Sequence, residues 1–377
     1  MHVVVQKADL LKALGYITSV VEKRNTIPVL SNVKIEALGD HLSLTTTDID
    51  IAVRDVIPAT VQAPLLTTVP AITLYDIVRK ISDDSTITFE QTTETPDQIS
   101  VKFGSSLFVL PCISSDEFPN FDLGVISHTF DVHSNILKAL LSKTKHAIST
   151  DEARYYLNGV YLHVHKSNKG LSALRAVATD GHRLAKVDAV LPTGLDAMPG
   201  VIIPRKTVME VVSLLEAHDK EVTIGVSEKK IMFQIGTIRV SSKLIDGKFP
   251  DYDRVIPKGN DKCMEVKVKD ILSAIDLVIA ISQDKVKSVK FDIEPSKLTL
   301  TASSLANSHL QGLQAIQVAY NSTTHISISF NSRYLLDALS VVDGDLVRLK
   351  LFNNSVAIII HDASDESSTY VVMPMEV

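Results

Sequence analysis

The segment Leu10-Leu-Lys-Ala-Leu-Gly15 recurs as Ile136-Leu-Lys-Ala-Leu-Leu141 and, in a weaker form, as Ile271-Leu-Ser-Ala-Ile275. The first two copies lie 126 positions apart, so the repeating unit is about as long as an ordinary domain. Mostly apolar residues recur after four and then three positions, from Leu10 to Val21 in the first copy and from Leu137 to Ile148 in the second. This spacing predicts an amphipathic helix that begins each repeat and buries one of its faces.

A second helical segment occurs later in each repeat, at residues 69–78, 203–212 and 330–339. The acidic residues that align across its three copies are Asp76, Glu210 and Asp337. Pro70 and Pro204 stand where two of these helices begin, a position at which a missing N–H costs little, and Asn331 can cap the third. Each repeat is therefore predicted to contain two helices.

Between the helices, polar and β-branched residues alternate, which is typical of strands with one buried face. The strand-like segments are residues 42–48, 174–180, 222–226, 298–304 and 347–352. Two linkers with a common Phe-Pro motif, at residues 116–122 and 247–253, connect the copies. Three tandem domains require two such linkers. We predict an α+β fold with two helices packed on antiparallel sheets in each domain. The predicted domains span residues 1–127, 128–258 and 259–377.

The composition agrees with a folded chain and excludes several classes of protein. Of the 377 residues, 45% are apolar and 22% are charged, which excludes disorder, and the absence of tryptophan predicts an aliphatic core. There is no run of about 18 apolar residues that could span a membrane. Cys112 and Cys263 lack a Cys-x-x-Cys context and are expected to be free thiols. Because the first residues lack the apolar segment of a signal peptide, we expect a cytoplasmic protein.

The charge distribution by itself does not decide whether the chain binds nucleic acid. The net charge of −6 argues against a protein that coats nucleic acid with a basic surface. Several cations nevertheless lie on or beside the predicted helices of the first two repeats, namely Lys12, Lys138, Lys145 and Arg205. Scattered lysines are most often part of a solvated face, so a basic lining and an ordinary surface are both open at this point.

Six segments, in order along the whole chain, carry a more specific pattern. They are Thr26-Ile-Pro-Val-Leu-Ser-Asn32, Arg154-Tyr-Tyr-Leu-Asn-Gly159, Ala178-Thr-Asp-Gly-His-Arg-Leu-Ala185, Val201-Ile-Ile-Pro-Arg-Lys206, Ser242-Lys-Leu-Ile-Asp-Gly-Lys-Phe-Pro-Asp-Tyr252 and Tyr370-Val-Val-Met-Pro-Met375. Together they resemble the β subunit of bacterial DNA polymerase III, the sliding clamp. The resemblance implies three DNA-clamp domains and a head-to-tail homodimer that closes a ring around duplex DNA. Six domains of about 35 Å diameter leave a hole about one domain wide, which is room for a duplex.

The resemblance also implies a non-catalytic processivity subunit that tethers the replicative DNA polymerase. The implied partners are duplex DNA without sequence preference, the polymerase catalytic subunit, an ATP-driven clamp loader, and other clamp-binding replication and repair proteins. The chain has no Gly-x-x-x-x-Gly-Lys-Ser/Thr P-loop, so we expect the ATP-driven step to belong to a separate protein. We expect no cofactor, no metal and no membrane partner.

By the same resemblance, short peptide motifs of the partners bind a groove between domains 2 and 3. The matching residues are Leu157, Thr179, Gly181, His182, Leu184, Pro250, Arg254, Val255, Val371, Val372, Met373, Pro374 and Met375. The residues implied in DNA contact are Arg24, Tyr155 and Tyr156, to which the charge pattern adds Lys12, Lys138, Lys145 and Arg205. The implied dimer interface is formed by Phe108, Leu110, Ile279 and Ile281. Two residues depart from the family pattern, because Asp253 and Glu376 stand where basic residues are expected.

Two alternatives stay open on the sequence alone. Asp180 and His182 could form an acid–base pair or part of a metal site, although Asp180-Gly181 more simply predicts a turn. An enzyme of this kind would lose turnover when either residue is replaced. The second alternative is a peptide-binding scaffold that never encircles DNA, which would be a stable monomer.

Overall fold

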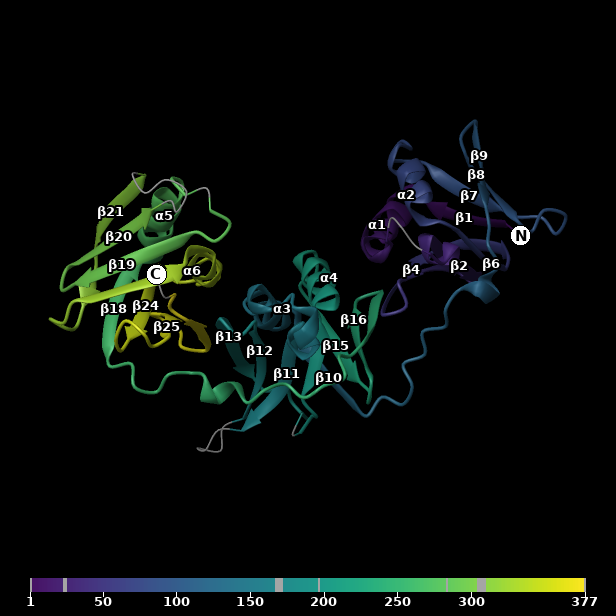
Figure 1. The fold of residues 1–377 in the computed structure, drawn as a ribbon. Helices are drawn as coiled ribbons and strands as arrows, with labels where there is room; N and C mark the ends of the chain where they lie inside the picture. Colours follow the sequence, from purple (N-terminus) through teal and green to yellow (C-terminus); the bar gives the residue numbers. More distant parts are fainter. Residues whose placement is uncertain are drawn as a thin grey trace. The chain divides into compact units, whose positions relative to one another are not determined.

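The computed structural model describes residues 2–22, 26–166, 172–195, 197–282, 284–303 and 310–375. The chain divides into two compact units, and Figure 1 labels most of their helices and strands. The first unit comprises residues 1–135, 192–194 and 206–244, and the second comprises residues 136–191, 195–205 and 245–377. The middle third of the sequence therefore contributes to both units.

The structure has an α-helix at each of the six predicted positions. The first helix of each repeat is α1 (Lys7–Ile17), α3 (Ser134–Ser142) or α5 (Val268–Ile279), and the second is α2 (Ala71–Arg79), α4 (Arg205–Glu216) or α6 (Ser332–Leu339). Asn331 caps α6 as predicted, because its Oδ1 accepts a hydrogen bond from the Arg333 N–H at 3.0 Å. Pro70 occupies the N-cap position of α2.

Two of the first helices end earlier than the apolar spacing predicts. Beyond each end lies a threonine that donates its hydroxyl to the carbonyl four residues earlier, Thr18 to Leu14 and Thr144 to Leu140, both at 2.7 Å. The Leu14 carbonyl also accepts the Thr18 N–H, so the hydroxyl bond there adds to the last helical hydrogen bond. Short 3-10 turns follow at both helix ends. The apolar pattern continues because residues in the irregular segment after each helix are buried as well.

The first unit contains two antiparallel sheets. The five-stranded sheet has the order β5-β1-β7-β8-β9, with β1 (His2–Gln6), β5 (Thr60–Ala63), β7 (Thr86–Glu90), β8 (Gln98–Phe103) and β9 (Ser106–Pro111). The eight-stranded sheet has the order β10-β15-β16-β17-β4-β3-β2-β6. Its strands are β2 (Asn32–Leu38), β3 (His41–Thr47), β4 (Ile51–Pro58), β6 (Leu65–Pro70), β10 (His128–His133), β15 (Glu221–Val226), β16 (Lys230–Ile235) and β17 (Ile238–Lys243).

The second unit also contains two antiparallel sheets. The nine-stranded sheet has the order β14-β11-β12-β13-β26-β25-β24-β18-β22. Its strands are β11 (Gly159–Lys166), β12 (Ser172–Thr179), β13 (Arg183–Val190), β14 (Val201–Pro204), β18 (Lys262–Lys267), β22 (Ala319–Tyr320), β24 (Leu346–Leu351), β25 (Ile358–Asp362) and β26 (Ser368–Val372). The four-stranded sheet has the order β21-β20-β19-β23, with β19 (Ser288–Glu294), β20 (Lys297–Ser303), β21 (Gln311–Gln317) and β23 (Ile326–Asn331).

The strand order repeats the pattern seen in the sequence. In each large sheet, a half-sheet from one repeat joins a half-sheet from the next through a single antiparallel pair, β4 with β17 and β13 with β26. The two pairs have equivalent registers, since Ala52 lies opposite Ser241 in the first and Leu184 lies opposite Val371 in the second. The strands that correspond to the two halves of such a pair, β21 and β9, are sheet edges in the described part of the chain.

The helices cover the sheets with their apolar faces. In the first unit α1 packs on β3 and β4, and in the second unit α5 packs on β19, β20 and β21. The residues that face the sheets, among them Leu10, Leu14 and Ile271, are fully buried. None of the described helices is long and apolar enough to cross a membrane.

Candidate functional site

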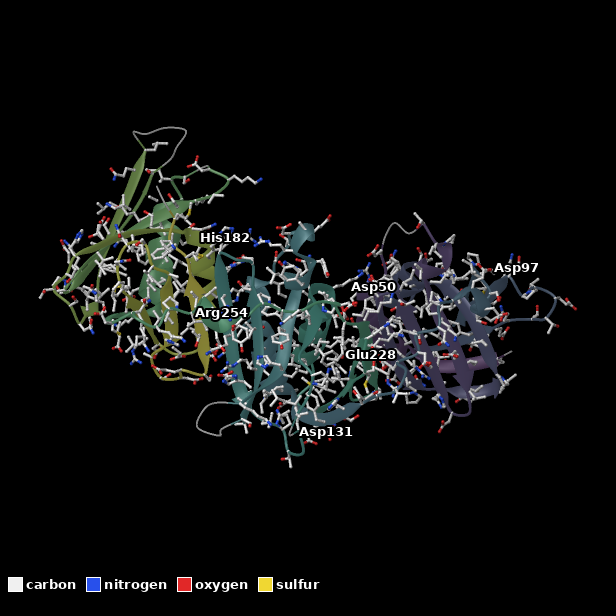
Figure 2. All side chains as sticks on the ribbon, turned by 60° about the horizontal axis from the view of Figure 1, so that its bottom comes forward. Asp50, Asp97, Asp131, His182, Glu228 and Arg254 are labelled. Carbon is white, nitrogen blue, oxygen red and sulfur yellow. The ribbon has the colours of Figure 1, made fainter. Side chains whose placement is uncertain are left out.

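The turn between β12 and β13 carries the most chemistry-like string of the sequence. Asp180 Oδ1 accepts hydrogen bonds from the N–H groups of His182 and Arg183 at 2.9 and 3.0 Å, and Asp180 Oδ2 accepts one from Arg183 Nε at 3.0 Å. Thr179 Oγ1 accepts a bond from the Gly181 N–H and donates one to the Arg183 carbonyl. Asp180 therefore closes a tight turn, as predicted, and His182 is exposed on it (Figure 2).

Gly181 is the residue that this turn requires. Its φ of +90° lies in the region that side chains other than glycine rarely adopt, and an added Cβ would meet Arg154 Nη1 at 2.6 Å. Arg154 belongs to the 3-10 helix η5 (Glu152–Leu157), so this helix lies directly against the turn. The last residue of η5, Leu157, is buried. The turn and η5 therefore form one packed body.

The C-terminal segment runs alongside the turn. β26 ends at Val372, and the backbone beyond it makes hydrogen bonds to other segments. The Met373 N–H donates to the His182 carbonyl at 3.0 Å, and the Met375 N–H donates to the Ser329 carbonyl at 2.8 Å. These two bonds fix the backbone of the segment, while the Met373 side chain is 49% exposed.

A hydrophobic cluster connects the turn, η5, β26 and the second linker. Its buried members are Leu157, Val177, Leu184, Ile202, Phe249, Tyr252, Ala357 and Val371. Tyr252 anchors the linker, because its hydroxyl accepts a hydrogen bond from Arg175 Nη1 at 3.2 Å and lies 2.9 Å from His163 Nε2. Burial raises the pKa of Tyr252, so its hydroxyl stays protonated and can donate to His163.

The residues predicted to line a peptide groove all lie in the second unit, and three of them, Leu157, Leu184 and Val371, are buried members of this cluster. The buried ones are Leu157, Thr179, Leu184, Val371 and Val372. The exposed or half-buried ones are Gly181, His182, Pro250, Arg254, Val255, Met373, Pro374 and Met375. Figure 2 labels His182 and Arg254. The second set is accessible to a ligand and the first set supports it, but the binding of a peptide there stays a prediction.

Two of the predicted or unusual positions cannot be compared with the structure, and a third lies near a cation. Arg24 and Glu376 lie outside the described residues. Asp253, which stands where the family pattern has a basic residue, is exposed and its Oδ1 lies 4.0 Å from Arg175 Nη1. The acidic side chain therefore faces a cation of the second unit.

The geometry does not support an acid–base pair of Asp180 and His182. Both carboxylate oxygens of Asp180 accept bonds from the turn itself, and the His182 ring is stacked near the Tyr334 ring, with centroids 6.4 Å apart. Among the described residues there is no group of three or more His, Cys, Asp or Glu side chains that could hold a metal ion. These residues build a turn and not a reacting centre.

An ion pair that the sequence did not predict ties this turn to α6. Arg183 Nη1 donates to Asp337 Oδ2 at 2.5 Å, and the Arg183 guanidinium lies 4.5 Å from the centre of the Tyr334 ring. The alignment of Asp337 with Asp76 and Glu210 marked the position in the repeat. It gave no sign of the partner, because that partner comes from a different repeat.

The cations predicted to contact DNA form no ion pair with any residue that the structure describes. They are Lys12 on α1, Lys138 on α3, Lys145 in the 3-10 turn η4 (Lys145–Ala147) and Arg205 at the start of α4. Lys12 and Arg205 are exposed, and the other two are half-buried. Lys206, next to Arg205, is instead held by the carboxylates of Glu22 and Asp48.

The two tyrosines predicted to contact DNA have different surroundings. Tyr155 is 54% exposed, whereas Tyr156 packs partly against the hydrophobic cluster. Their rings meet edge to face with centroids 5.8 Å apart. Only Tyr155 therefore presents a large part of its ring to solvent.

Of the residues predicted for a dimer interface, two are at least partly accessible and two are buried. Phe108 is exposed on the edge strand β9, whereas Leu110 of the same strand is buried. Ile279 is the last residue of α5 and is buried, and Ile281 is half-buried beside Gly312 of the edge strand β21. Phe108 and Ile281 thus lie at the two open sheet edges, while the other two residues also serve the core of their own unit.

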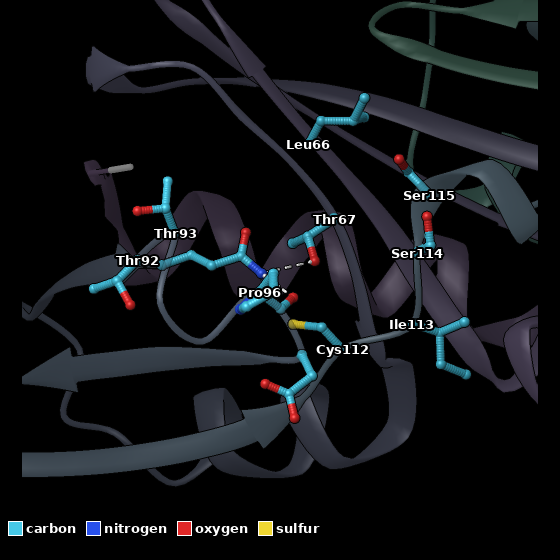
Figure 3. Close-up of a pocket in the computed structure, with 11 residues that line it drawn as sticks. Leu66, Thr67, Thr92, Thr93, Pro96, Cys112, Ile113, Ser114 and Ser115 are labelled. Carbon is cyan, nitrogen blue, oxygen red and sulfur yellow. Dashed lines mark hydrogen bonds between the residues drawn. The ribbon is translucent and has the colours of Figure 1, made fainter.

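A cavity of about 490 Å³ in the first unit lies outside every predicted site (Figure 3). Hydroxyl side chains and Cys112 line it, and the Gln91 amide donates to Thr67 Oγ1 at 3.4 Å and to the Pro96 carbonyl at 2.9 Å. Burial raises the pKa of the Cys112 thiol, so this cysteine is a poor nucleophile near neutral pH.

Repeated pairs of helices on antiparallel sheets, joined sheet to sheet, define a DNA-clamp protein. Models of the N-terminal, central and C-terminal domains of the DNA polymerase III beta subunit match residues 1–122, 131–251 and 253–376. The chain belongs to the DNA polymerase III beta-subunit family.

Known relatives agree with this membership. The beta sliding clamp of Caulobacter vibrioides is 40% identical over 377 residues, which cover 100% of both chains. A solved structure of the sliding clamp of Bartonella birtlesii, bound to griselimycin, has a TM-score of 0.95 at 41% identity and covers 100% of both chains. A solved structure of DNA polymerase III beta from Caulobacter crescentus has a TM-score of 0.94 at 40% identity over 100% of both chains. The predicted function as a sliding clamp, a non-catalytic processivity subunit of DNA polymerase III, is confirmed.

Proposed function

We propose that two copies of this chain associate head to tail and close a ring around duplex DNA. The strand pairs that join successive repeats carry this proposal. Successive repeats are joined twice by equivalent antiparallel pairs, β4 with β17 and β13 with β26. By position in the repeat, β21 corresponds to β4 and β13, and β9 corresponds to β17 and β26. A second copy can therefore supply the missing partner to each open edge, and a heterologous contact whose rotation closes gives a ring.

The side chains on the two edges support the same contact. Leu313 on β21 is 65% exposed, and Leu107 and Val109 on β9 are 58% and 53% exposed. Edge strands with exposed apolar side chains are templates for pairing with another strand. In the proposed interface, Phe108 and Leu110 of one copy meet the end of α5, with Ile279 and Ile281, beside β21 of the other.

We propose that DNA is contacted by Lys12, Lys138, Lys145 and Arg205, which lie on or beside helices, and by Arg24, Tyr155 and Tyr156. The four helix-associated cations form no ion pair with a described carboxylate, so they can approach phosphates. A chain of net charge −6 with a few such cations holds DNA weakly. Weak phosphate contacts without base readout suit a protein that must slide.

We further propose that the accessible residues around Tyr252, from Gly181 and His182 to Met375, bind short peptides of partner proteins. Aliphatic and methionine side chains adapt to varied peptides, and Arg254 adds a cation at the exposed side. The proposed partners are the replicative polymerase, an ATP-driven clamp loader and other replication and repair proteins. The proposed compartment is the cytoplasm, where bacterial replication takes place.

The ring is tested by retention on DNA of different topology. The chain is loaded on nicked circular DNA with a clamp loader and ATP, and the salt is then raised to about 1 M, where phosphate contacts are screened. A closed ring stays on the circle and leaves once a restriction enzyme linearises it. Equal loss from intact and linearised circles would contradict the proposal.

A further inference from the structure

The antiparallel pair β4–β17, called the first joint below, joins the first two repeats. It is the structural counterpart of the pair β13–β26, the second joint, beside which the proposed peptide groove lies. In the first joint Ala52 lies opposite Ser241, and in the second Leu184 lies opposite Val371. The linkers correspond as well, because Phe121 holds the position in residues 116–122 that Tyr252 holds in residues 247–253. The chain therefore contains a second copy of the same local architecture, with different side chains.

The different side chains leave this first joint hollow. Leu184 and Val371 fill the second joint as members of the hydrophobic cluster, whereas the smaller Ala52 and Ser241 stand at the equivalent positions here. A cavity of about 420 Å³ lies at this place. Besides these two residues, its lining includes Phe121 and Leu123 from the linker and a pair of arginines, Arg54 and Arg239.

The two arginines make the lining of the cavity positively charged. Arg54 and Arg239 are directly opposite each other across the β4–β17 pair, an arrangement that is unfavourable for like charges. Arg54 Nε donates to Ser43 Oγ at 2.6 Å, and Arg239 Nε donates to Gln234 Oε1 at 2.9 Å. In the described part of the chain neither guanidinium has an ion-pair partner, so the terminal N–H groups of both are available to an anion.

Further charges at the cavity leave it positive. Lys230 lies with its ammonium 4.7 Å from the centre of the Phe121 ring and donates to the Asp122 carbonyl. The one acidic side chain in the described lining is Asp122, whose Oδ1 accepts from the Gly124 N–H at 3.0 Å. The described lining therefore holds two cations and one carboxylate that is already hydrogen-bonded, and Lys230 adjoins this lining through Phe121 and Asp122.

The position on the sheet favours a peptide over DNA. Val53 and Asp55 of β4 are buried on the face that α1 covers. The positive charge of Lys12 on α1 is close enough to favour the charged form of the Asp55 carboxyl. Because side chains alternate along a strand, Ala52 and Arg54 point to the opposite face. The proposed DNA contact Lys12 therefore lies across the sheet from this cavity.

We propose that the β4–β17 joint is a second peptide site, specific for an acidic segment of a partner protein with an apolar residue beside its carboxylates. Arg54 and Arg239 bind the carboxylates, and Phe121 and Leu123 contact the apolar side chain. The site rests on the repeat relationship and on its own charges, and it does not require that the groove near Tyr252 binds peptides.

The test uses the full-length chain and a fluorescein-labelled hexapeptide of alternating Glu and Leu, followed by fluorescence anisotropy. We expect saturable binding that weakens about tenfold between about 50 mM and about 200 mM salt. Replacing every Glu of the peptide by Gln, or combining Arg54→Gln with Arg239→Gln, is expected to weaken binding about tenfold or more. The control variant K290Q/K297Q removes two positive charges elsewhere and is expected to bind as the unchanged chain does.

Four results would overturn the proposal. The first is no saturable binding of the Glu-Leu peptide, and the second is equal binding of its Gln counterpart or of R54Q/R239Q. The third is loss of the peptide in Met373→Asp while R54Q/R239Q still binds it, which would locate the peptide in the groove near Tyr252 and leave the proposed function standing. The fourth is a larger effect of R54Q/R239Q on a DNA duplex of about 20 base pairs than on the peptide, which would assign the arginines to DNA.

Discussion

Arg183 and Asp337 form an ion pair with Nη1 and Oδ2 2.5 Å apart, and this pair ties the β12–β13 turn to α6. The side chains are only 11% and 31% exposed. Asp180 holds the other side of the same guanidinium through its Nε, and the Tyr334 ring lies against its face. One arginine therefore fixes both the turn that carries His182 and the helix beneath the C-terminal segment.

Replacing Arg183 is expected to lower the free energy of unfolding by about 2 kcal/mol, because Asp180 and Asp337 would be left half-buried without their cation. The measurement is urea unfolding of Arg183→Gln. Arg79→Gln is the matched control, since Arg79 pairs with Asp76 on an exposed helix face and should cost less than about 0.5 kcal/mol. Equal effects of the two substitutions would show that the Arg183 pair contributes no more than a surface pair.

Leu313→Asp is expected to convert the proposed dimer into a monomer. The substitution places a charge on the exposed edge of β21, where an incoming β9 would have to bury it without a partner. Light scattering after size exclusion should fall from twice the mass of the chain to the mass of one chain. Val190→Asp, at an 83% exposed position on β13, a strand in the interior of its sheet, serves as control. A monomeric unchanged chain at micromolar concentration would instead favour a scaffold that does not encircle DNA.

The sequence predicted the repeat because the signals for it are local. Helix spacing, the Asn331 cap and the Asp180-Gly181 turn each depend on a few neighbouring residues, and all three are present in the structure. Contacts between repeats were not predictable in this way. Arg183 and Asp337 are 154 positions apart, and no pattern in either segment identifies the other as its partner.

The same limit applies to the residues of the proposed groove. The family pattern names Leu157, Leu184 and Val371 together with exposed residues such as Met373, but it does not separate the layer that packs from the layer that a ligand can touch. That division depends on the register of β13 with β26, which places Leu184 opposite Val371 inside the cluster. Register is set by pairing across the whole sheet and is therefore not readable from one strand.

Met373→Asp is expected to weaken the binding of partner peptides at least about tenfold, because it places a charge in the exposed apolar part of the groove. The backbone bond from Met373 to His182 does not depend on the side chain, so stability and the dimer should be unchanged. The measurement is anisotropy with a labelled peptide from the polymerase subunit. Met209→Asp, at an exposed methionine of α4, is the control. Unchanged affinity in Met373→Asp would contradict the groove assignment.

Replacing Lys12, Lys138, Lys145 and Arg205 by Gln is expected to weaken binding to linear duplex DNA and to flatten its salt dependence. Each lost phosphate contact lowers the slope of log K against log salt by about 0.9. Retention on closed circles at high salt should not change, because it depends on the closed ring. A slope equal to that of the unchanged chain would contradict the DNA contacts and would mean that these four cations belong to an ordinary solvated surface. The control is again K290Q/K297Q.

His146 is expected to make the stability of the second unit depend on pH. Burial, reinforced by the nearby cation of Arg183, lowers the pKa of His146 from 6.5 to about 4. Among the residues that the structure describes, its buried Nδ1 has no hydrogen-bond partner, and its ring lies 5.7 Å from that of Tyr370, so the folded state holds the neutral form. The unfolded chain binds a proton more readily below about pH 6.5. The stabilisation is therefore complete above that pH and is lost as the pH falls towards about 4.

The expected loss from His146 is about 2 kcal/mol between about pH 7.5 and about pH 5. Burial also lowers the pKa of His163 and His361, so the whole protein loses more stability than this single group explains. Urea unfolding of the unchanged chain and of His146→Gln at both pH values isolates the contribution, because the variant should lose about 2 kcal/mol less on acidification. An equal loss in both proteins would mean that His146 is protonated in the folded state, which would require a partner for its charge beside Arg183.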